Sequence, residues 1–193
     1  AVKLELNQRV FTNLGIDQNA VLTAKTVVNE YEEPQLHKML GIYGEIKNAR
    51  TLASAIVSER FARPFETTKD LIELLDRLAP RGREFKYYAQ VFQAIRIEVN
   101  DEMGALEDFL TQAPEVLKPG GRLVIESYHS LEDRMVKNYI NKGKFFGEVE
   151  KDFFGNPIKP LSAVNRKLIT ASEEELKVNN RARSAKLRIA EKI

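Results

Sequence analysis

The run LKPGGRLVIESYHSLEDR, residues 117–134, combines a helix end, a tight turn, a buried strand and a new helix start. Pro119 cannot continue a helix, and the lysine before it suits the negative end of one. Gly120 and Gly121 allow the backbone to turn with a positive φ angle. The apolar residues that follow predict a short buried strand over residues 123–128. This order of elements indicates an α/β fold.

Three polar side chains, Ser127, His129 and Ser130, lie where this strand is predicted to end. The carboxyl ends of strands are where open α/β sheets bind their ligands. Ser130 is also the expected N-cap of a helix over residues 131–139, with Asp133 as the capping acid. A serine hydrolase is not favoured, because no nucleophile elbow or oxyanion turn surrounds the serine. The loop therefore either binds a ligand or merely ends a strand and caps a helix.

The composition limits the class of protein and its partners. A chain of 193 residues, of which 43% are hydrophobic, can bury the core of one large domain or two small ones. The net charge of +2 means that any affinity for nucleic acid must come from local patches. With no cysteine and two histidines, disulfides and a metal site are not expected, which fits a reducing cytoplasm. No apolar run is long enough for a membrane span, so no membrane partner is expected.

Periodicity and helix caps predict a helical first half and a mixed second half. The helices of the first half are expected near residues 23–31, 34–44, 45–61 and 68–78. Pro80 and Gly82 separate them from a long helix over residues 85–109, which carries apolar residues at three-and-four spacing. In the second half we expect a short helix before Pro119 and, after the run described above, strands over residues 164–169 and near 185–190.

The turn LKPGGRLV is similar to the late helix-to-strand step of class I S-adenosylmethionine-dependent methyltransferases. Its continuation, SYHSLEDRMVK at residues 127–137, resembles the MraW/RsmH family more specifically. Enzymes of this family methylate N4 of a cytidine in the 16S RNA of the bacterial small ribosomal subunit. Three further blocks carry the same resemblance in the family's order: residues 22–31, 91–102 and 181–188.

The resemblance implies a class I, Rossmann-like α/β fold, of which this chain holds the C-terminal part of the sheet plus an inserted small helical subdomain. Residues 1–20 would be an N-terminal connecting segment, residues 21–83 the helical substrate-recognition subdomain, and residues 84–193 the C-terminal portion of the α/β domain. The family's glycine-rich donor-binding segment has no counterpart in this sequence. S-adenosylmethionine is the implied cofactor, but no residue of this chain is assigned to bind it.

The implied reaction suggests roles for the polar residues. An exocyclic amine is a poor nucleophile, so groups that accept its N–H bonds help to align it for attack. Asn100 and Ser127 are the expected acceptors, and His129 would orient a neighbour or take up a proton. The residues expected to bind the RNA substrate are Gln93, Arg96, Ser130, Arg134, Arg181, Arg183 and Lys186. For Arg96 and Asn100, four residues apart on a helix, a surface polar pair is the alternative.

Two basic clusters favour contact with RNA phosphates. The first consists of Arg77, Arg81, Arg83 and Lys86, and the second of Arg181, Arg183, Lys186 and Arg188. The aromatic residues beside the first cluster, Phe85, Tyr87 and Tyr88, are candidates for stacking on unpaired bases. A base that is methylated must leave its stack, so stacking side chains suit this chemistry.

Two functions follow. The first is S-adenosylmethionine-dependent methylation of the N4 amine of a cytidine in small-subunit rRNA, within the 30S particle and in the cytoplasm. The second is a non-catalytic RNA-binding or ribosome-assembly module, because the donor-binding segment is missing from this sequence. A structural helical domain without an RNA role is a weaker third reading. We also expect a homo-oligomer, because an incomplete sheet exposes an edge to other chains.

Overall fold

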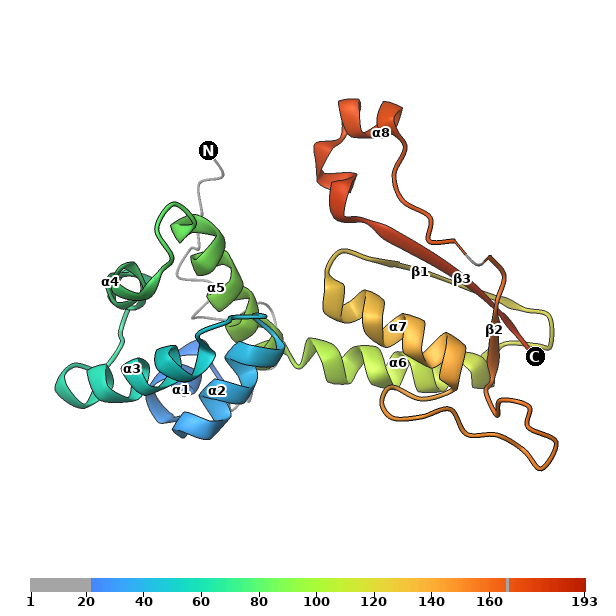
Figure 1. Ribbon diagram of the computed structural model, residues 1–193, viewed down its shortest axis with the longest axis horizontal. Helices are drawn as coiled ribbons and strands as arrows, with labels where there is room; N and C mark the ends of the chain where they lie inside the picture. Colours follow the sequence, from blue (N-terminus) through green and yellow to red (C-terminus); the bar gives the residue numbers. More distant parts are fainter. Residues whose placement is uncertain (1–21, 166) are drawn as a thin grey trace. The chain divides into compact units, whose positions relative to one another are not determined.

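The computed structural model describes residues 22–165 and 167–193 (Figure 1). They form two compact units, one up to Glu102 and one from Met103 onward. The predicted connecting segment, residues 1–20, lies outside the described residues. No helix in the described part of the chain is long and apolar enough to cross a membrane.

Within residues 22–102, the first unit consists of helices that pack around one apolar core. These are α1 (Ala24–Glu30), α2 (Glu33–Ile42), α3 (Ala49–Ala62), α4 (Thr68–Leu78) and α5 (Glu84–Asn100). The leucines and isoleucines on their inner faces are almost completely buried: Leu36, Leu40, Leu52, Ile56, Leu71 and Leu75. The predicted caps of two helices are confirmed, because the hydroxyls of Thr23 and Thr67 accept hydrogen bonds from the first turns of α1 and α4.

Helix α3 begins four residues later than its periodicity suggested. Glu45, at the predicted start, has a φ angle of 50°, which belongs to the left-handed region rather than to a right-handed helix. Residues 43–48 therefore form a loop between α2 and α3.

The long helix predicted over residues 85–109 is wrong, because the chain breaks it at Asp101. This residue has φ 48° and ψ 42°, a left-handed conformation that ends α5, and α6 (Glu102–Val116) begins directly after it. A single left-handed residue is a common way to end a helix, and aspartate adopts that conformation more readily than most residues. The separate short helix expected before Pro119 is also wrong, since α6 continues through Pro114 to Val116.

Helix α5 completes the core of the first unit with one apolar face. Tyr87, Val91, Phe92 and Ile95 all lie on this face and are buried. The compact helical unit therefore extends to Glu102, whereas the predicted subdomain covers residues 21–83. The roles predicted for these regions do not follow from packing and stay predictions.

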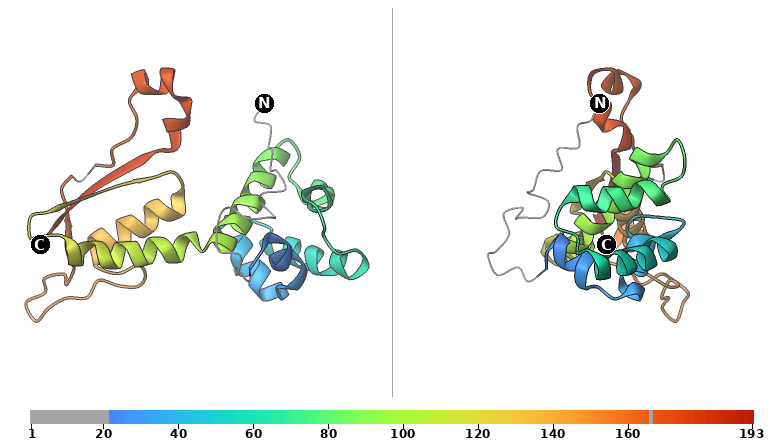
Figure 2. Two further views of the ribbon diagram at one scale, coloured as in Figure 1. Left: turned by 180° about the vertical axis from the view of Figure 1, so that it is seen from behind. Right: turned by 90° about the vertical axis from the view of Figure 1, so that its left-hand side faces the viewer.

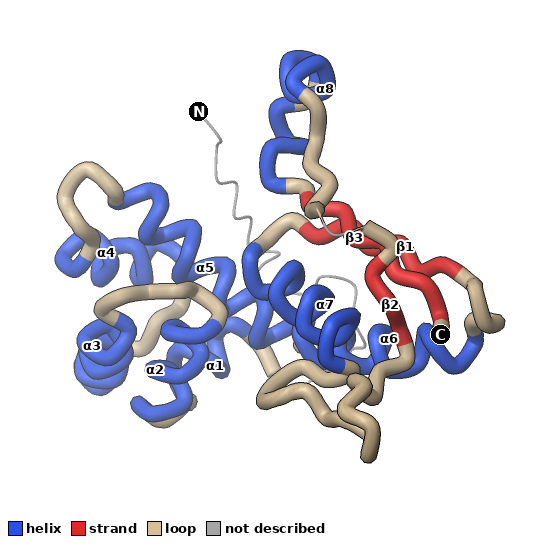
Figure 3. Tube along the Cα trace, turned by 45° about the vertical axis from the view of Figure 1, so that its right-hand side comes forward, coloured by secondary structure: helices blue, strands red, loops and turns tan. Residues whose placement is uncertain are grey.

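The second unit is a small mixed α/β layer structure. Its strands are β1 (Arg122–Ser127), β2 (Leu161–Ala163) and β3 (Lys186–Lys192), in the order β1-β3-β2. Strand β3 is antiparallel to both neighbours, and β1 and β3 run side by side over their whole length (Figures 1 and 2). Helices α6 and α7 (Ser130–Lys142) pack against the sheet through an apolar core that includes Leu110, Tyr139 and Leu161 (Figure 3). Helix α8 (Glu173–Val178) and the short 3-10 helix η2 (Asn180–Ser184) precede β3.

Strand β1 alternates between a buried and an exposed face. Leu123 and Ser127 are buried, whereas Arg122, Val124 and Glu126 on the other face are exposed. Glu126, which interrupts the apolar pattern of the predicted strand, lies on this exposed face, so its carboxylate is not buried. Among the described strands β1 pairs only with β3, so its other edge has no described partner.

The mixed α/β architecture and the strands predicted at residues 123–128 and near 185–190 are confirmed. The strand predicted over residues 164–169 is wrong, because β2 ends at Ala163. Val164 still donates its backbone N–H to the carbonyl oxygen of Ile189 at 3.0 Å, and Ile169 makes an isolated bridge with Leu187. Between them, the side-chain amide of Asn165 donates to the carbonyl oxygen of Lys167 at 2.6 Å, a local contact that competes with strand pairing. The Rossmann-like arrangement and the insertion of the helical unit stay predictions.

Because Asp101 has a left-handed conformation, a glycine at this position should stabilise the chain. Asp101→Gly should raise the free energy of unfolding by about 0.5 kcal/mol, because glycine adopts the left-handed conformation without a steric penalty. If α5 and α6 formed one continuous helix, the same substitution would lower stability by about 1 kcal/mol. Urea unfolding followed by circular dichroism measures the difference. Asp101→Val is the opposite control, since a β-branched residue at this φ should destabilise the chain.

Candidate functional site

Ser127 is the last residue of β1 and pairs with Lys186 of β3. Its side chain is buried, and its hydroxyl donates to the carbonyl oxygen of Lys186 at an Oγ–O distance of 3.4 Å. This contact is long for a hydroxyl hydrogen bond and therefore weak. Because the proton points to the carbonyl, the lone pairs of Oγ remain able to accept a hydrogen bond.

His129, not Ser130, is the N-cap of α7, so the predicted cap is wrong by one residue. The Nδ1 atom of His129 accepts from the backbone N–H of Glu132 at 3.3 Å. The carboxylate of Glu132 in turn accepts from the backbone N–H groups of Tyr128, at 3.0 Å, and of His129, at 3.4 Å. The two residues thus form a capping box, which leaves Ser130 exposed in the first turn of the helix.

The other ring nitrogen of His129 is buried next to the same carboxylate. Nε2 lies 3.1 Å from Oε1 of Glu132 but without the alignment of a hydrogen bond. The side chain of His129 is 14% exposed. The imidazole is thus oriented by Glu132 through its cap, a role that sequence reasoning missed. The sequence does contain the signal for this capping box: a histidine three residues before a glutamate, at the start of an amphipathic helix.

Asp133, the predicted capping acid, instead ties α7 to β3. Its carboxylate accepts from Nε of Arg188 at 2.7 Å and from Nζ of Lys186 at 3.4 Å. Burial alone would raise the pKa of Asp133, but the hydrogen bond from Arg188 and the two positive charges lower it on balance. The carboxylate is therefore ionised near neutral pH and holds both cations against the sheet.

The second basic cluster is divided by this ion pair. Lys186 and Arg188 point to Asp133, whereas Arg181 and Arg183 lie exposed on η2, with no ion-pair partner in the described ranges. Arg134 is exposed on α7. From the sequence, Lys186 and Arg183 were both predicted to bind RNA. The packing of β3 against α7 shows that Lys186 is bound to a carboxylate, whereas Arg183 is not.

In the first unit, Glu102 gathers the side chains of Arg96 and Asn100. Nε and one terminal nitrogen of Arg96 donate to the two carboxylate oxygens at 2.8 and 3.1 Å, a bidentate pair. Nδ2 of Asn100 donates to Oε1 of Glu102 at 3.1 Å, so its Oδ1 is the atom left to accept. The break at Asp101 makes this possible, because it folds Glu102 back toward the end of α5. Gln93, by contrast, donates across a long 3.5 Å contact to the carbonyl oxygen of Tyr43.

The members of the first basic cluster differ in whether they are ion-paired, and their aromatic neighbours differ in whether they are exposed. Arg77 pairs with Glu59 at 2.6 Å, whereas Arg83 and Lys86 have no ion-pair partner among the residues described. Phe85 is 79% exposed, but Tyr87 and Tyr88 are only 4% and 9% exposed. The prediction that both tyrosines stack on bases is therefore wrong, because they lie on the face of α5 that completes the helical core.

Comparison with known proteins places the chain in a family. Residues 11–193 match the MraW methylase family, and the chain belongs to it. It is 56% identical to the ribosomal RNA small subunit methyltransferase H of Cytophaga hutchinsonii, over 93% of this chain and 60% of that protein. Identity to the proteins of the same name from Christiangramia forsetii and Flavobacterium johnsoniae is 54% and 52%, over 94% of this chain and 60% of each protein. The chain thus spans about 60% of the length of these curated relatives.

The described residues do not form a complete site for S-adenosylmethionine. A nucleotide-like ligand of an open α/β sheet is usually held by a glycine-rich turn between a strand and a helix. The described turn from β1 to α7 is Tyr128-His129, without glycine, and its backbone N–H groups are taken by Glu132. No group of three or more metal-binding side chains is found in the ranges described.

The buried ion pair of Asp133 predicts a stability change that depends on pH. Asp133→Asn should lower the free energy of unfolding by about 3 kcal/mol at neutral pH, because it leaves two partly buried cations without a carboxylate. The pKa of Asp133 is lowered on folding, so this stabilisation is complete above the unfolded value of about 3.9 and is lost as the pH falls below it.

Urea unfolding at several pH values between neutral and about pH 3 measures this effect. The difference between wild type and Asp133→Asn should narrow as the pH falls. Asp108→Asn, on the exposed surface of α6, is the matched control and should change stability little at any pH. A constant difference across the range would contradict a charged Asp133 as the source.

Proposed function

We propose that this chain serves in the methylation of small-subunit ribosomal RNA, with S-adenosylmethionine as methyl donor and the N4 amine of a cytidine as acceptor. The observation that carries the proposal is the family match over residues 11–193, together with relatives named ribosomal RNA small subunit methyltransferase H. The substrate would be the RNA within the 30S particle, and the compartment would be the cytoplasm.

Two acceptor atoms support a role in positioning the amine. Oγ of Ser127 has its proton directed to a backbone carbonyl, and Oδ1 of Asn100 is left to accept because the amide nitrogen is bound to Glu102. An amine whose N–H bond is accepted by either of these atoms has its nitrogen lone pair aligned for attack on a methyl group. His129, oriented by Glu132, is proposed to orient a neighbouring group or to take up the proton that the amine loses.

Exposed cations on both units support contact with RNA. Arg181 and Arg183 are exposed on η2 of the second unit, and Arg134 and Ser130 are exposed on α7. Arg96 and Gln93 are proposed to contact RNA from α5. Arg96 and Lys186 would do so only while also bound to Glu102 and Asp133, which makes them the weakest members of the predicted set.

A non-catalytic RNA-binding or assembly module is the second candidate. It is favoured by one observation, the lack of a glycine-rich strand-to-helix turn among the described residues. In that case Ser127 and His129 would end a strand and cap a helix without contacting a methyl donor.

Titration calorimetry of this chain with S-adenosylmethionine, followed by methyl transfer to small ribosomal subunits, separates the two candidates. Saturable donor binding with transfer of labelled methyl to a cytidine supports the enzyme. RNA binding by a folded chain that binds no donor would support the second candidate for this chain. Transfer of the methyl to another nucleotide would contradict the N4-cytidine assignment.

Ser127→Ala and Asn100→Ala should each lower kcat for methyl transfer by at least about tenfold with little change in stability, because each removes an acceptor for the amine. Asn is a good N-cap, so His129→Asn should preserve the start of α7 while it removes the imidazole. A His129→Asn chain with normal stability and normal kcat would restrict His129 to capping. Arg181→Gln is the control that should raise KM for the RNA and leave kcat nearly unchanged.

A further inference from the structure

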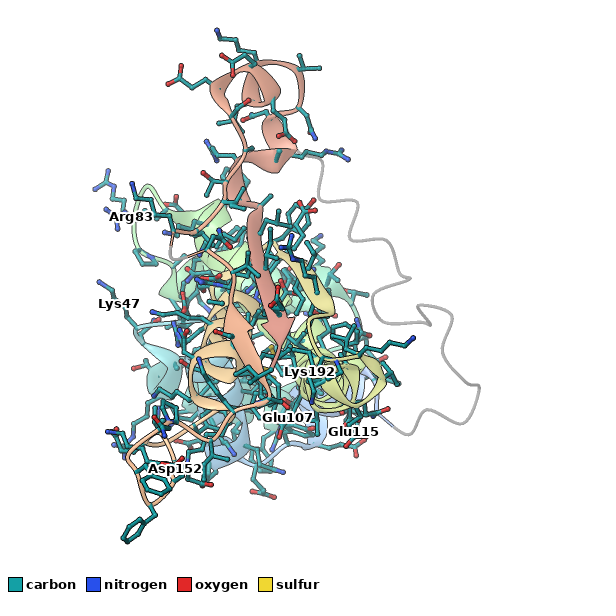
Figure 4. All side chains as sticks on the ribbon, turned by 90° about the vertical axis from the view of Figure 1, so that its right-hand side faces the viewer. Lys47, Arg83, Glu107, Glu115, Asp152 and Lys192 are labelled. Carbon is teal, nitrogen blue, oxygen red and sulfur yellow. The ribbon has the colours of Figure 1, made fainter. Side chains whose placement is uncertain are left out.

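A pocket of about 290 Å³ lies in the first unit, between the loop of residues 43–48 and the start of α5. Its lining includes three cations, Lys47, Arg83 and Lys86, which come from separate segments of the chain. The side chains of Lys47 and Arg83 extend to the same side of this unit (Figure 4). The fold thus brings together charges that are almost 40 residues apart in the sequence.

None of these cations has an ion-pair partner within residues 22–165 and 167–193. Arg77, nearby in the sequence, is by contrast neutralised by Glu59. Glu45 is the one carboxylate of the lining, and it has an interaction of its own. Three unpaired positive charges against one carboxylate give the pocket a net positive field.

The start of α5 carries a carboxylate of its own. Arg83 is the N-cap of this helix, and its side chain makes no capping hydrogen bond. The carboxylate of Glu84 accepts instead from the backbone N–H of Gly82, at 2.7 Å. An acidic side chain at this position offsets the partial positive charge of the first N–H groups of a helix. The positive field of the pocket therefore comes from its three side-chain cations.

Tyr87 forms part of the wall of the pocket through its ring. The residue is 4% exposed, and its hydroxyl is buried beside the side chain of Asn48, without a hydrogen bond of normal geometry. Burial raises the pKa of Tyr87, while a hydrogen-bond interaction with Asn48 lowers it somewhat. The hydroxyl therefore belongs to the core of the unit, and the charged groups of the pocket are its three cations and Glu45.

The backbone of the loop is held in an unusual conformation at the same place. Glu45 has a φ angle of 50°, and the side-chain amide of Gln90 donates to the carbonyl oxygen of Gly44 at 2.8 Å. Left-handed non-glycine residues persist where the surrounding structure requires them, and they cluster at binding sites. Gln90 thus fixes the loop that presents Lys47 to the pocket.

We propose that this pocket binds a phosphate group of the RNA backbone. This inference rests on the proposed function in one respect, namely that RNA is the source of the phosphate. Three unpaired cations around one cavity suit a phosphate, whose oxygens accept several hydrogen bonds at once. The volume accommodates a phosphate with part of its sugar, and such a contact fixes the register of RNA without reading its sequence.

The test compares two variants of equal net charge by the anisotropy of a labelled single-stranded RNA that has no terminal phosphate. The pocket variant is Lys47→Gln, Arg83→Gln, Lys86→Gln. The matched control is Lys38→Gln, Arg50→Gln, Lys69→Gln, at exposed positions of the same unit outside the pocket. The pocket variant should bind at least about tenfold more weakly, and its slope of log affinity against log salt should fall by about 0.7 for one lost phosphate. The control should keep the wild-type slope.

Titration with orthophosphate and with cytidine monophosphate distinguishes the sources of the anion. Much weaker binding of these small anions than of RNA supports a backbone phosphate as the ligand. Orthophosphate that binds as tightly as RNA would assign the pocket to a free anion and overturn the RNA source. If both triple variants lose affinity equally, the attraction is diffuse and the pocket assignment fails while the proposed function stands. A wild-type chain that binds no RNA would contradict both.

Discussion

The ion pair between Asp133 and Arg188 is the constraint on which the second unit depends. It joins α7 to β3 through a nearly buried carboxylate, and Lys186 adds a second cation to the same group. Because β1 pairs with β3 along its whole length, the position of α7 also fixes where β1 ends relative to the start of this helix. Ser127 and His129 lie at that junction. The geometry of the proposed methylation loop thus rests on a salt bridge between elements about 55 residues apart in the sequence.

Carboxylates have a common organising role around the candidate residues. Glu132 orients His129 and satisfies the backbone of the β1–α7 turn, while Glu102 holds Arg96 and the amide nitrogen of Asn100. Glu102 uses the amide nitrogen of Asn100 and leaves its oxygen available, while the hydroxyl proton of Ser127 is directed to the carbonyl oxygen of Lys186. An acceptor is what an aromatic amine needs while its nitrogen attacks a methyl group. The acids therefore support the proposed chemistry without themselves contacting the substrate.

Patterns that depend on local sequence could be predicted, and those that depend on distant contacts could not. The helices around Leu71 and Leu75, and the strand at Leu123, follow from apolar spacing, because each buries one face against a core. The break at Asp101 has no strong local signal, since the apolar spacing continues from α5 into α6 while the two helices serve different cores. The acceptor roles of Asn100 and Ser127 remain predictions from chemistry and resemblance. That Lys186 is paired and Arg183 is not could only be found once β3 was packed against α7.

Whether a basic residue is ion-paired with a carboxylate, rather than how many basic residues there are, decides where this chain is expected to bind RNA. The net charge is only +2, so a field that attracts phosphate must come from cations whose charge is not cancelled nearby. Arg77, Lys186 and Arg188 belong to conspicuous basic clusters yet are bound to carboxylates. Lys47 belongs to no cluster in the sequence, but the loop after α2 brings it to Arg83 and Lys86 at the start of α5. A phosphate is therefore expected where the fold leaves cations unpaired around a cavity, which is a property of tertiary structure and not of composition.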